Sequence, residues 1–301
     1  MKKVLFALLY FTGVTRFAAW WHRKRVVFLC YHGVTQLAER SPSDPHGLHV
    51  RRDRFELHLD FLRRRYRVVS LREYLDARLE GRRLPPYSVV LTFDDGFRNF
   101  LTAAAPCLAE RSMPASIFLI TDHMSENGGP DFARVWSPAD DSTYLSWAEV
   151  RALCREQMIE VGSHTCSHPR LLHLTPEEIR RELLDSFKAI TGKLGNPRPA
   201  LSYPRGEYTG IIAALAEETG YSCAVTTDRG TNEMDHSLFN LGRTLIGDND
   251  DTASFAVRVS GVRWWLARLR SIVKGTAPRS VAPEVEAQPA VCVKADFRQS
   301  T

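Results

Sequence analysis

The sequence lacks the cysteine patterns that define disulfide-stapled and zinc-finger proteins. Its six cysteines form no C-x-x-C pair and are scattered through predicted strands, helices and the C-terminal tail. In a chain of 301 residues, such cysteines are expected to be free thiols, which favours a reducing compartment. The net charge is only +5, and neither zinc-finger spacing nor an aromatic RNA-binding signature is present. Nucleic acid is therefore not an expected partner.

The sequence also has no apolar run long enough to cross a membrane as one helix. The uncharged residues 4–15 are fewer than the roughly 20 that a spanning helix needs, and no small-x-small cleavage signal follows them. Two lysines precede this run and the aromatic, basic residues 17–25 follow it, which is typical of a helix lying at a lipid interface. A terminal helix packed on the domain is the alternative. We expect residues 1–25 to be a distinct segment of a protein in the cytoplasm or on the inner face of a membrane, with export left open.

Short β-branched runs alternate with amphipathic stretches from residue 26 onward. Such alternation indicates a parallel sheet covered by helices, and seven or eight units in about 220 residues indicate a distorted or incomplete (β/α) barrel. We expect this single α/β domain over residues 26–274, and a loosely ordered tail over residues 275–301, which are rich in Pro and Ala. The predicted strands are residues 26–31, 67–69, 88–93, 115–120, 159–163, 200–203, 223–227 and 241–245.

Two capping boxes and one insertion mark the segments between these strands. Ser70 with Glu73, and Thr175 with Glu178, each predict the start of a helix. Residues 125–143 interrupt the alternation, and they form either a wall over the site or a solvated insertion.

Three short segments carry the candidate chemistry, and each follows a predicted strand, where barrel enzymes place their active sites. In the first, Asp94 and Asp95 close an apolar strand before Gly96. Two adjacent carboxylates repel each other unless a cation or a proton compensates the charge, although an exposed Asp-Asp-Gly turn would avoid this cost. In the second, His164 and His168 are close enough in sequence to converge on one metal ion.

The second and third segments are expected to be loops. Pro169 disfavours α geometry at His168, which places the histidine pair on a loop after the strand. Two histidines and one carboxylate leave positions open for water and substrate, as catalytic metal sites do. In the third segment, residues 202–206, Pro204 and Gly206 can shape a rigid loop whose backbone N–H groups face the reacting atom.

Together these segments resemble the polysaccharide deacetylase family, the NodB-homology domain of carbohydrate esterase family four. Residues 92–96 match its T-F-D-D-G motif, and residues 164–168 match its H-[ST]-x-x-H motif. The loop with Pro204 and Gly206 resembles the third motif, which implies that these two residues contact the substrate. The resemblance covers residues 85–245.

The resemblance implies a metal-dependent hydrolase that removes N-acetyl groups from amino sugars of a polysaccharide or glycan. It makes Asp94 the general base and Asp95, His164 and His168 the ligands of a divalent metal ion. Zinc is the first choice, with cobalt, manganese and nickel as alternatives. The backbone N–H of Tyr203 is expected to stabilise the oxyanion together with the metal.

The sequence departs from the family pattern at two positions. Many members supply the general acid as a histidine in a late Leu-x-His motif, but residues 238–246 contain no histidine. His32, at the end of the first predicted strand, is the best candidate substitute; a structural role beside the metal ligands is the alternative. Residues 30–34 are also similar to a Y-H-x-V element in a subset of the family. Ser202 stands near the position of an arginine that orients the base, and Arg243 is a candidate replacement.

Two other functions are compatible with the same residues. The first is deacylation of a lipid-linked sugar at a membrane, which residues 1–25 and the basic stretch 258–274 would favour. The second is a catalytically silent glycan-binding protein, which the missing histidine would favour. The intact aspartate and histidine pairs favour an enzyme, because a binding module needs no base beside a metal. The expected partner is an N-acetylated glycan, with contact to a membrane surface through residues 1–25.

Overall fold

The structure is a computed structural model, and it describes residues 2–36, 44, 47–126, 143–155, 158–228 and 231–262. The predicted tail lies outside the described residues, as do residues 127–142 of the predicted insertion and residues 263–274 of the basic stretch.

Eight parallel strands form the central sheet, and all eight coincide with predicted strands. The order is β10-β1-β5-β6-β7-β8-β9, and β4 pairs with the first residues of β5. A small parallel pair, β2 (Gly33–Thr35) and β3 (His49–Arg51), was not predicted. The sheet strands are β1 (Val27–Tyr31), β4 (Arg67–Val68), β5 (Ser88–Phe93), β6 (Ala115–Leu119), β7 (Ile159–Ser163), β8 (Leu201–Ser202), β9 (Ala224–Val225) and β10 (Arg243–Leu245).

The two ends of the sheet meet and close a barrel. A parallel bridge joins Val225 of β9 to Leu241, just before β10. The Thr226 N–H donates to the Leu241 carbonyl at 2.9 Å, and the Leu241 N–H donates to the Ala224 carbonyl at 3.0 Å. This short seam confirms the prediction of a distorted barrel of parallel strands.

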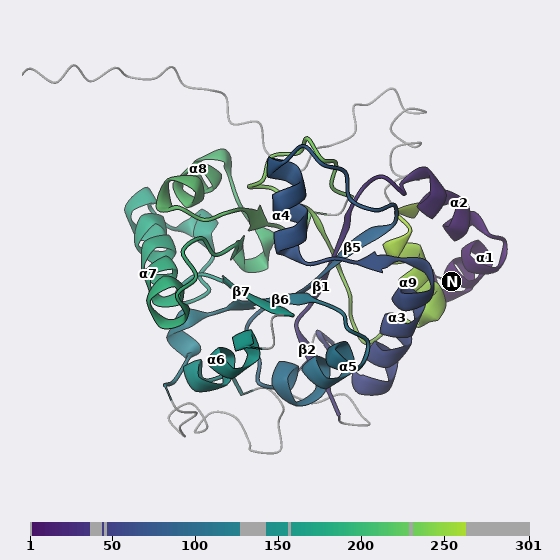
Figure 1. The fold of residues 1–301 in the computed structure, drawn as a ribbon, viewed down its shortest axis with the longest axis horizontal. Helices are drawn as coiled ribbons and strands as arrows, with labels where there is room; N and C mark the ends of the chain where they lie inside the picture. The colour runs from purple at the N-terminus through teal and green to yellow at the C-terminus, as the bar shows by residue number, and fades with distance from the viewer. Residues whose placement is uncertain are drawn as a thin grey trace, which may run out of the picture.

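Helices surround the strands as a ring (Figure 1). The predicted capping boxes mark real helix starts, since the Ser70 side chain caps α4 and Thr175 caps α7. The helices are α1 (Lys2–Phe11), α2 (Val14–Trp21), α3 (Arg52–Arg65), α4 (Leu71–Leu79), α5 (Ala105–Glu110), α6 (Trp147–Arg155), α7 (Pro176–Leu194), α8 (Gly210–Thr219) and α9 (Thr252–Val259). One π-helical turn (Phe100–Ala104) leads into α5, and short 3₁₀ turns cover Thr121–His123, Leu171–His173 and Pro204–Gly206.

Alternation along the strands divides the core into two layers. Leu29 and Leu91 belong to the large cluster that packs against the helices. Phe28, Val90 and Phe118, of the opposite parity, belong to a second cluster inside the barrel. Because side chains of a strand alternate between its two faces, this parity decides which residues at the strand ends can point into the barrel.

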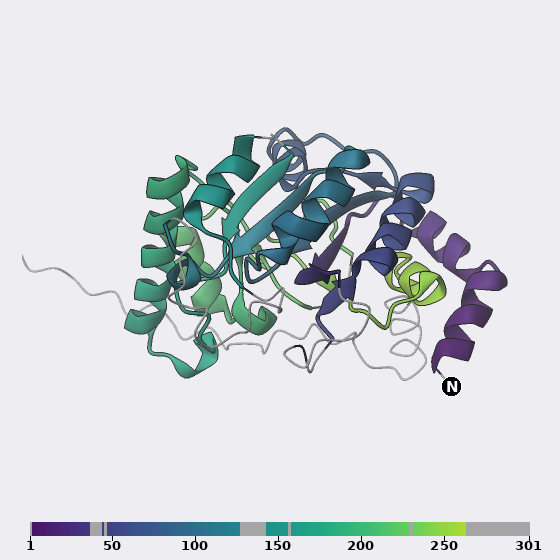
Figure 2. The ribbon, with the colours of Figure 1, turned by 90° about the horizontal axis from the view of Figure 1, so that it is seen from below.

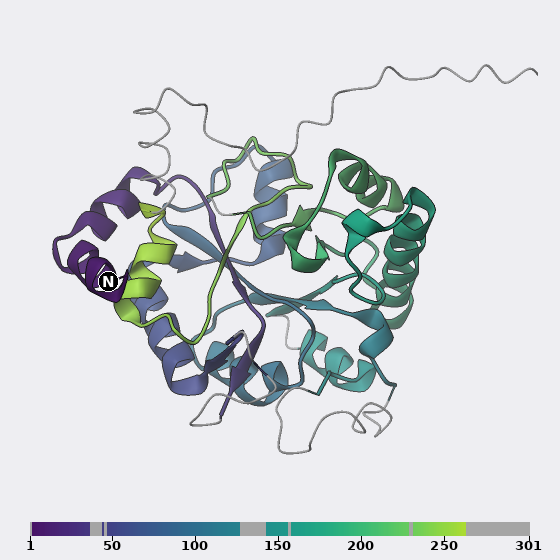
Figure 3. The ribbon, with the colours of Figure 1, turned by 180° about the vertical axis from the view of Figure 1, so that it is seen from behind.

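The two N-terminal helices lie outside the ring, beside α9 (Figures 2 and 3). Phe6, Leu9 and Ala18 pack with Val257 and Val262. The two helices thus pack on the domain, as in the alternative that the sequence left open, and one face of each helix stays exposed. In the described part of the chain no single helix is long and apolar enough to cross a membrane; α1 and α2 meet that criterion only as a pair, bent by 72°.

Candidate metal centre and active site

Strand parity brings polar side chains from several strands to one end of the barrel interior. Val90 faces inward, so Thr92 of the same strand and Asp94 directly after it point to the same side. β10 pairs with β1 in the register Phe28 to Arg243, so the arginine side chain also enters the interior. The carboxyl ends of parallel strands therefore converge here, as the barrel rule requires.

Asp94 and Arg243 form a bidentate ion pair that is buried completely. Two N–H···O distances of 2.7 Å join the guanidinium to the two carboxylate oxygens. The other guanidinium donors reach the Thr92 hydroxyl (3.1 Å), the Ser202 hydroxyl (2.9 Å) and the Thr226 carbonyl (3.0 Å). All five N–H donors of the arginine are thus used, which holds the carboxylate in one orientation.

This ion pair controls the charge of Asp94. Burial alone would raise the pKa of the carboxyl group, but the adjacent charge of Arg243 holds the pKa well below its ordinary value. The prediction that Arg243 replaces the arginine missing near Ser202 is confirmed in its geometry, since the guanidinium contacts both the Ser202 hydroxyl and Asp94.

Asp95, His164 and His168 lie together at the ends of β5 and β7. The Asp95 Oδ1 atom is 3.4 Å from His164 Nε2 and 3.9 Å from His168 Nε2, and the three candidate ligand atoms lie within 4.8 Å of one another. Asp95 and His168 have positive φ angles of 72° and 58°. The turns after the strands therefore aim these side chains, in agreement with the predicted loop at His168.

The donor set fits a divalent metal ion. The His164 Nδ1–H donates to the Ser202 carbonyl at 2.8 Å, which directs the lone pair of Nε2 toward Asp95. Burial lowers the pKa of His164 to about 3, so the ring is in the neutral form that binds metals. Burial and the charge of Asp94 raise the pKa of Asp95 to about 7. Among the described residues, the ionised form of Asp95 therefore has too little nearby positive charge to stabilise it, and a bound cation would supply more.

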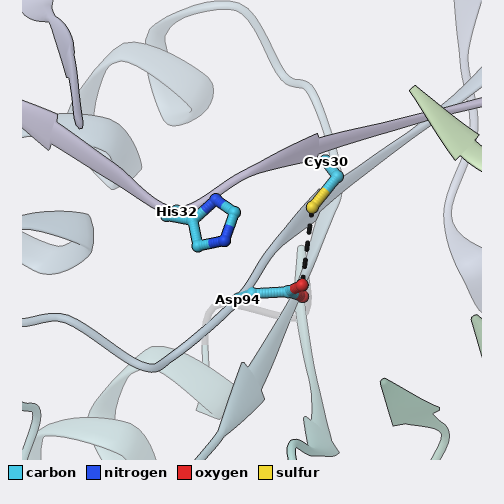
Figure 4. Close-up of side chains that lie close together, drawn as sticks. All are labelled: Cys30, His32 and Asp94. Atoms are coloured by element: carbon cyan, nitrogen blue, oxygen red, sulfur yellow. Dashed lines mark hydrogen bonds between the residues drawn. The ribbon is translucent and has the colours of Figure 1, made fainter. Parts of the chain in front are cut away.

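His32 and Cys30 lie beside Asp94 (Figure 4). The Cys30 thiol is 3.4 Å from Asp94 Oδ2, and the His32 Nδ1 atom is buried with no hydrogen-bond partner among the described residues. Burial lowers the pKa of His32 to about 4. Cys30 was not predicted as a site residue, although its position two residues before His32 places it on the same side of the chain.

The predicted role of the Tyr203 backbone does not fit the structure. Its N–H donates to the Val225 carbonyl at 3.1 Å, which extends the pairing of β8 with β9. Its hydroxyl donates to the Phe239 carbonyl at 3.0 Å, and its ring is buried. The prediction that the Tyr203 N–H binds the oxyanion is therefore wrong, because the sheet already uses that donor.

Pro204 and Gly206 shape the loop and are buried themselves. Gly206 has a φ of 72°, and a Cβ atom at this residue would lie 2.1 Å from the Thr227 hydroxyl. The Gly206 carbonyl accepts a hydrogen bond from the Thr226 hydroxyl at 2.9 Å. The structure thus explains these two residues by backbone packing, and direct contact with substrate stays a prediction.

Both described ends of the predicted insertion are attached to the site motifs. Before it, the Thr121 and Asp122 N–H groups donate to the Thr165 and Cys166 carbonyls at 3.2 and 3.0 Å. After it, the Leu145 N–H donates to the Gly96 carbonyl at 2.9 Å. The insertion therefore leaves and rejoins the barrel beside the aspartate and histidine motifs.

Comparison with known proteins agrees with this site. A sequence model of the family described as polysaccharide deacetylase matches residues 81–224. A Bacillus subtilis protein with that family name is 24% identical over 240 residues, which are 79% of this chain and 77% of the relative. The poly-β-1,6-N-acetyl-D-glucosamine N-deacetylase of Escherichia coli is 25% identical over 274 residues, 81% of this chain. The chain spans only 40% of the length of that relative.

A solved structure shows the same fold. The Streptococcus pyogenes deacetylase PplD superposes with a TM-score of 0.65 at 23% sequence identity, and the match covers 78% of this chain and 98% of that chain. The predicted α/β fold of the NodB type is confirmed by this likeness. The family match over residues 81–224, the relatives and the fold agree with the motifs, so this chain is similar to the polysaccharide deacetylases.

Proposed function

We propose that this protein is a metal-dependent hydrolase that removes N-acetyl groups from amino sugars of a polysaccharide. The observation that carries the proposal is the grouping of Asp95, His164 and His168 beside a second carboxylate, Asp94, that Arg243 holds ionised. The names of the relatives support the predicted class of enzyme, a carbohydrate N-deacetylase. Because the Escherichia coli relative acts on poly-β-1,6-N-acetyl-D-glucosamine, we choose that polymer as the first substrate to test.

We propose zinc as the metal, held by Asp95, His164 and His168. Two imidazole nitrogens and one carboxylate oxygen are a common ligand set of catalytic zinc, and they leave room for water and substrate. When bound, the ion supplies a positive charge that acidifies a water molecule and polarises the amide carbonyl. The neutral state of His164 and the raised pKa of Asp95 support this assignment.

In this proposal Asp94 is the general base. Its carboxylate takes the proton of the attacking water as the oxygen adds to the acetyl carbonyl carbon. Arg243 is a positioning residue, since it fixes the carboxylate through two hydrogen bonds and keeps it ionised. The Ser202 hydroxyl, 3.2 Å from Asp94 Oδ2, adds a third constraint on the same group.

We propose His32 as the residue that protonates the leaving amine. The carbon–nitrogen bond breaks readily only when the nitrogen gains a proton. His32 lies beside Asp94, and its lowered pKa makes the ring neutral before catalysis, so it must receive the proton that Asp94 took from water. Transfer from Asp94 to the imidazole and then to the amine returns both side chains to their starting states.

Acetate release tests the function directly. Purified protein loaded with one equivalent of Zn²⁺ should release acetate from β-1,6-linked N-acetylglucosamine oligomers and leave free amines in equal number. Dialysis against a chelator should abolish the release, and Zn²⁺ should restore it. Absence of acetate release from these oligomers and from chitooligosaccharides, by protein with stoichiometric metal, would contradict the proposal.

The two alternative functions receive less support. A catalytically silent protein does not account for a buried base paired with an arginine next to a ligand set. The same assay distinguishes deacetylation of a polysaccharide from deacylation of a lipid-linked sugar. Detergent-dispersed lipid-linked N-acetylglucosamine serves as the competing substrate. We propose the cytoplasm or the inner face of a membrane as the location, which fractionation of cells would test.

A further inference from the structure

The N-terminal helices expose large apolar side chains on the face opposite to their buried side. α1 and α2 bury one face against α9, through residues such as Leu9 and Ala18. Their other face carries seven of the 13 exposed large hydrophobic side chains of the described residues. We call this set the α1–α2 apolar face: Val4, Leu5, Leu8, Phe11, Phe17, Trp20 and Trp21.

This arrangement reverses the usual pattern of a surface helix. A helix at a protein surface normally directs polar side chains to solvent. Here Val4 is 74% exposed, Phe11 81% and Trp21 60%. Apolar patches of this kind on a soluble surface indicate a site of contact with a partner or a membrane.

An aromatic cluster at the end of α2 combines apolar rings with a cation. The Phe17, Trp20 and Trp21 ring centroids are 5.9 to 6.4 Å apart. The Arg23 guanidinium lies 4.6 Å from the centre of the Trp20 ring and donates to the Trp20 carbonyl. Tryptophan beside arginine is typical of protein segments at the headgroup level of a bilayer.

The charges within the N-terminal segment itself are of one sign. Residues 1–38 contain six lysine and arginine residues and no aspartate or glutamate. Arg16 and Arg65 line a cavity of about 190 Å³ between α2 and α3, together with Tyr10 and Tyr66. A phosphate group at this cavity would meet two guanidinium groups, which are well suited to bind it.

We propose that the α1–α2 apolar face docks the protein on the surface of an anionic phospholipid bilayer. The apolar side chains enter the interfacial region, and the basic residues contact lipid phosphates. A second copy of this chain is a poorer partner, because two such faces would bring like charges together. The bend of 72° and the packing of both helices on α9 favour helices that lie along the surface.

Vesicle sedimentation with the full chain tests the proposal. The protein should sediment with vesicles of phosphatidylglycerol and phosphatidylcholine, and much less with phosphatidylcholine alone. The triple variant Phe17→Ser, Trp20→Ser, Trp21→Ser should lower the partition coefficient by about 100-fold or more, because three aromatic side chains no longer leave water. The variant Arg16→Gln, Lys24→Gln should lower binding to the anionic vesicles by about fivefold per charge, and added salt should act in the same direction.

The matched control removes exposed apolar side chains from the opposite side of the ring. Leu184 of α7 and Ile211 of α8 are 40% and 55% exposed, and the variant Leu184→Ser, Ile211→Ser should bind vesicles like the wild type. The aromatic variant should keep its melting temperature and its acetate release from soluble oligomers, which separates this proposal from the catalytic one. Equal vesicle binding of the wild type and the aromatic variant would overturn the proposal, as would concentration-dependent dimerisation without vesicle binding.

Discussion

The candidate site and the N-terminal helices both depart from the usual distribution of polar and apolar side chains, but in opposite directions. At the carboxyl ends of the strands, charged groups are buried, and Asp94 and Arg243 satisfy each other there. At the N-terminal helices, apolar groups such as Phe11 and Trp21 are exposed. Both arrangements oppose the tendency of polar groups to face water and apolar groups to avoid it. Each departure therefore needs a partner that offsets its cost. For the buried charges, the partner is the opposite charge within the protein, and for the α1–α2 apolar face, we propose that it is a lipid surface outside the protein.

Among substitutions at the candidate site, removal of the proposed base should cause the largest loss of activity. Asp94→Asn keeps the size of the side chain but cannot accept the proton, so kcat should fall by about 1,000-fold or more. Bound zinc should stay near one equivalent, since Asp95 and the histidines are unchanged. Acetate release and metal analysis on the same sample measure both quantities, with Asp185→Asn on the exposed side of α7 as the control. Full activity of Asp94→Asn would show that another group is the base.

Removal of a proposed metal ligand should weaken zinc binding and leave the ion pair of Asp94 with Arg243 intact. His164→Ala should lower the zinc affinity by about 100-fold or more and reduce acetate release accordingly, because one of three protein ligands is lost. Excess Zn²⁺ should restore part of the activity of this variant but none of that of Asp94→Asn. Titration with a fluorescent zinc chelator gives the affinity. Unchanged zinc content in both His164→Ala and Asp95→Ala would contradict the assigned site.

The guanidinium group that pairs with Asp94 can be supplied from a different strand. Arg243→Ser leaves Asp94 buried without its partner, and we expect a loss of about 3–5 kcal/mol in unfolding free energy together with a fall in kcat of about 10- to 100-fold. Adding Ser202→Arg supplies a guanidinium from β8, whose Ser202 hydroxyl now lies 2.9 Å from the arginine. The double variant should recover kcat to within about tenfold of the wild type, with KM little changed throughout.

The outcome of that exchange distinguishes positioning from simple stabilisation. Arg243→Lys keeps the charge but loses the paired geometry, so it should be more stable than Arg243→Ser while kcat stays low. If the double variant regains stability and no activity, Arg243 acts only as a structural group. Thermal unfolding and steady-state kinetics on the four proteins provide the readings.

The smallest effect is expected at Tyr203. Tyr203→Phe removes the hydrogen bond to the Phe239 carbonyl and should cost about 1 kcal/mol of unfolding free energy. The backbone pairing with Val225 is unaffected, so kcat should stay within about twofold of the wild type. A large loss of kcat at unchanged stability would assign the hydroxyl a role that its buried position does not suggest.

Local patterns were sufficient for much of the fold. The eight strands of the main sheet are β-branched or apolar runs between helix signals, and each was predicted within a few residues. The capping boxes at Ser70 and Thr175 also gave correct helix starts. β2 and β3 escaped prediction because their pairing, which joins Val34 to Val50, depends on contacts distant in sequence.

The motifs located the candidate metal ligands, but the environment of the candidate base depended on strand register. Neither the spacing nor the composition of the sequence shows that Arg243 lies opposite Phe28 and so reaches Asp94. For Tyr203, the motif suggested a free N–H in a loop, whereas the pairing between β8 and β9 continues through that residue. Both results come from sheet geometry, which a single sequence does not display.

The origin of the two partners of the ion pair has a consequence for biosynthesis. Asp94 leaves the ribosome about 150 residues before Arg243, which belongs to the last strand of the described residues. Until that strand pairs with β1, the nascent chain has the Asp94 carboxylate without the counter-charge of Arg243. Synthesis of β10 therefore supplies the counter-charge of the candidate base, and a translation product that ends before Arg243 should lack the ion pair.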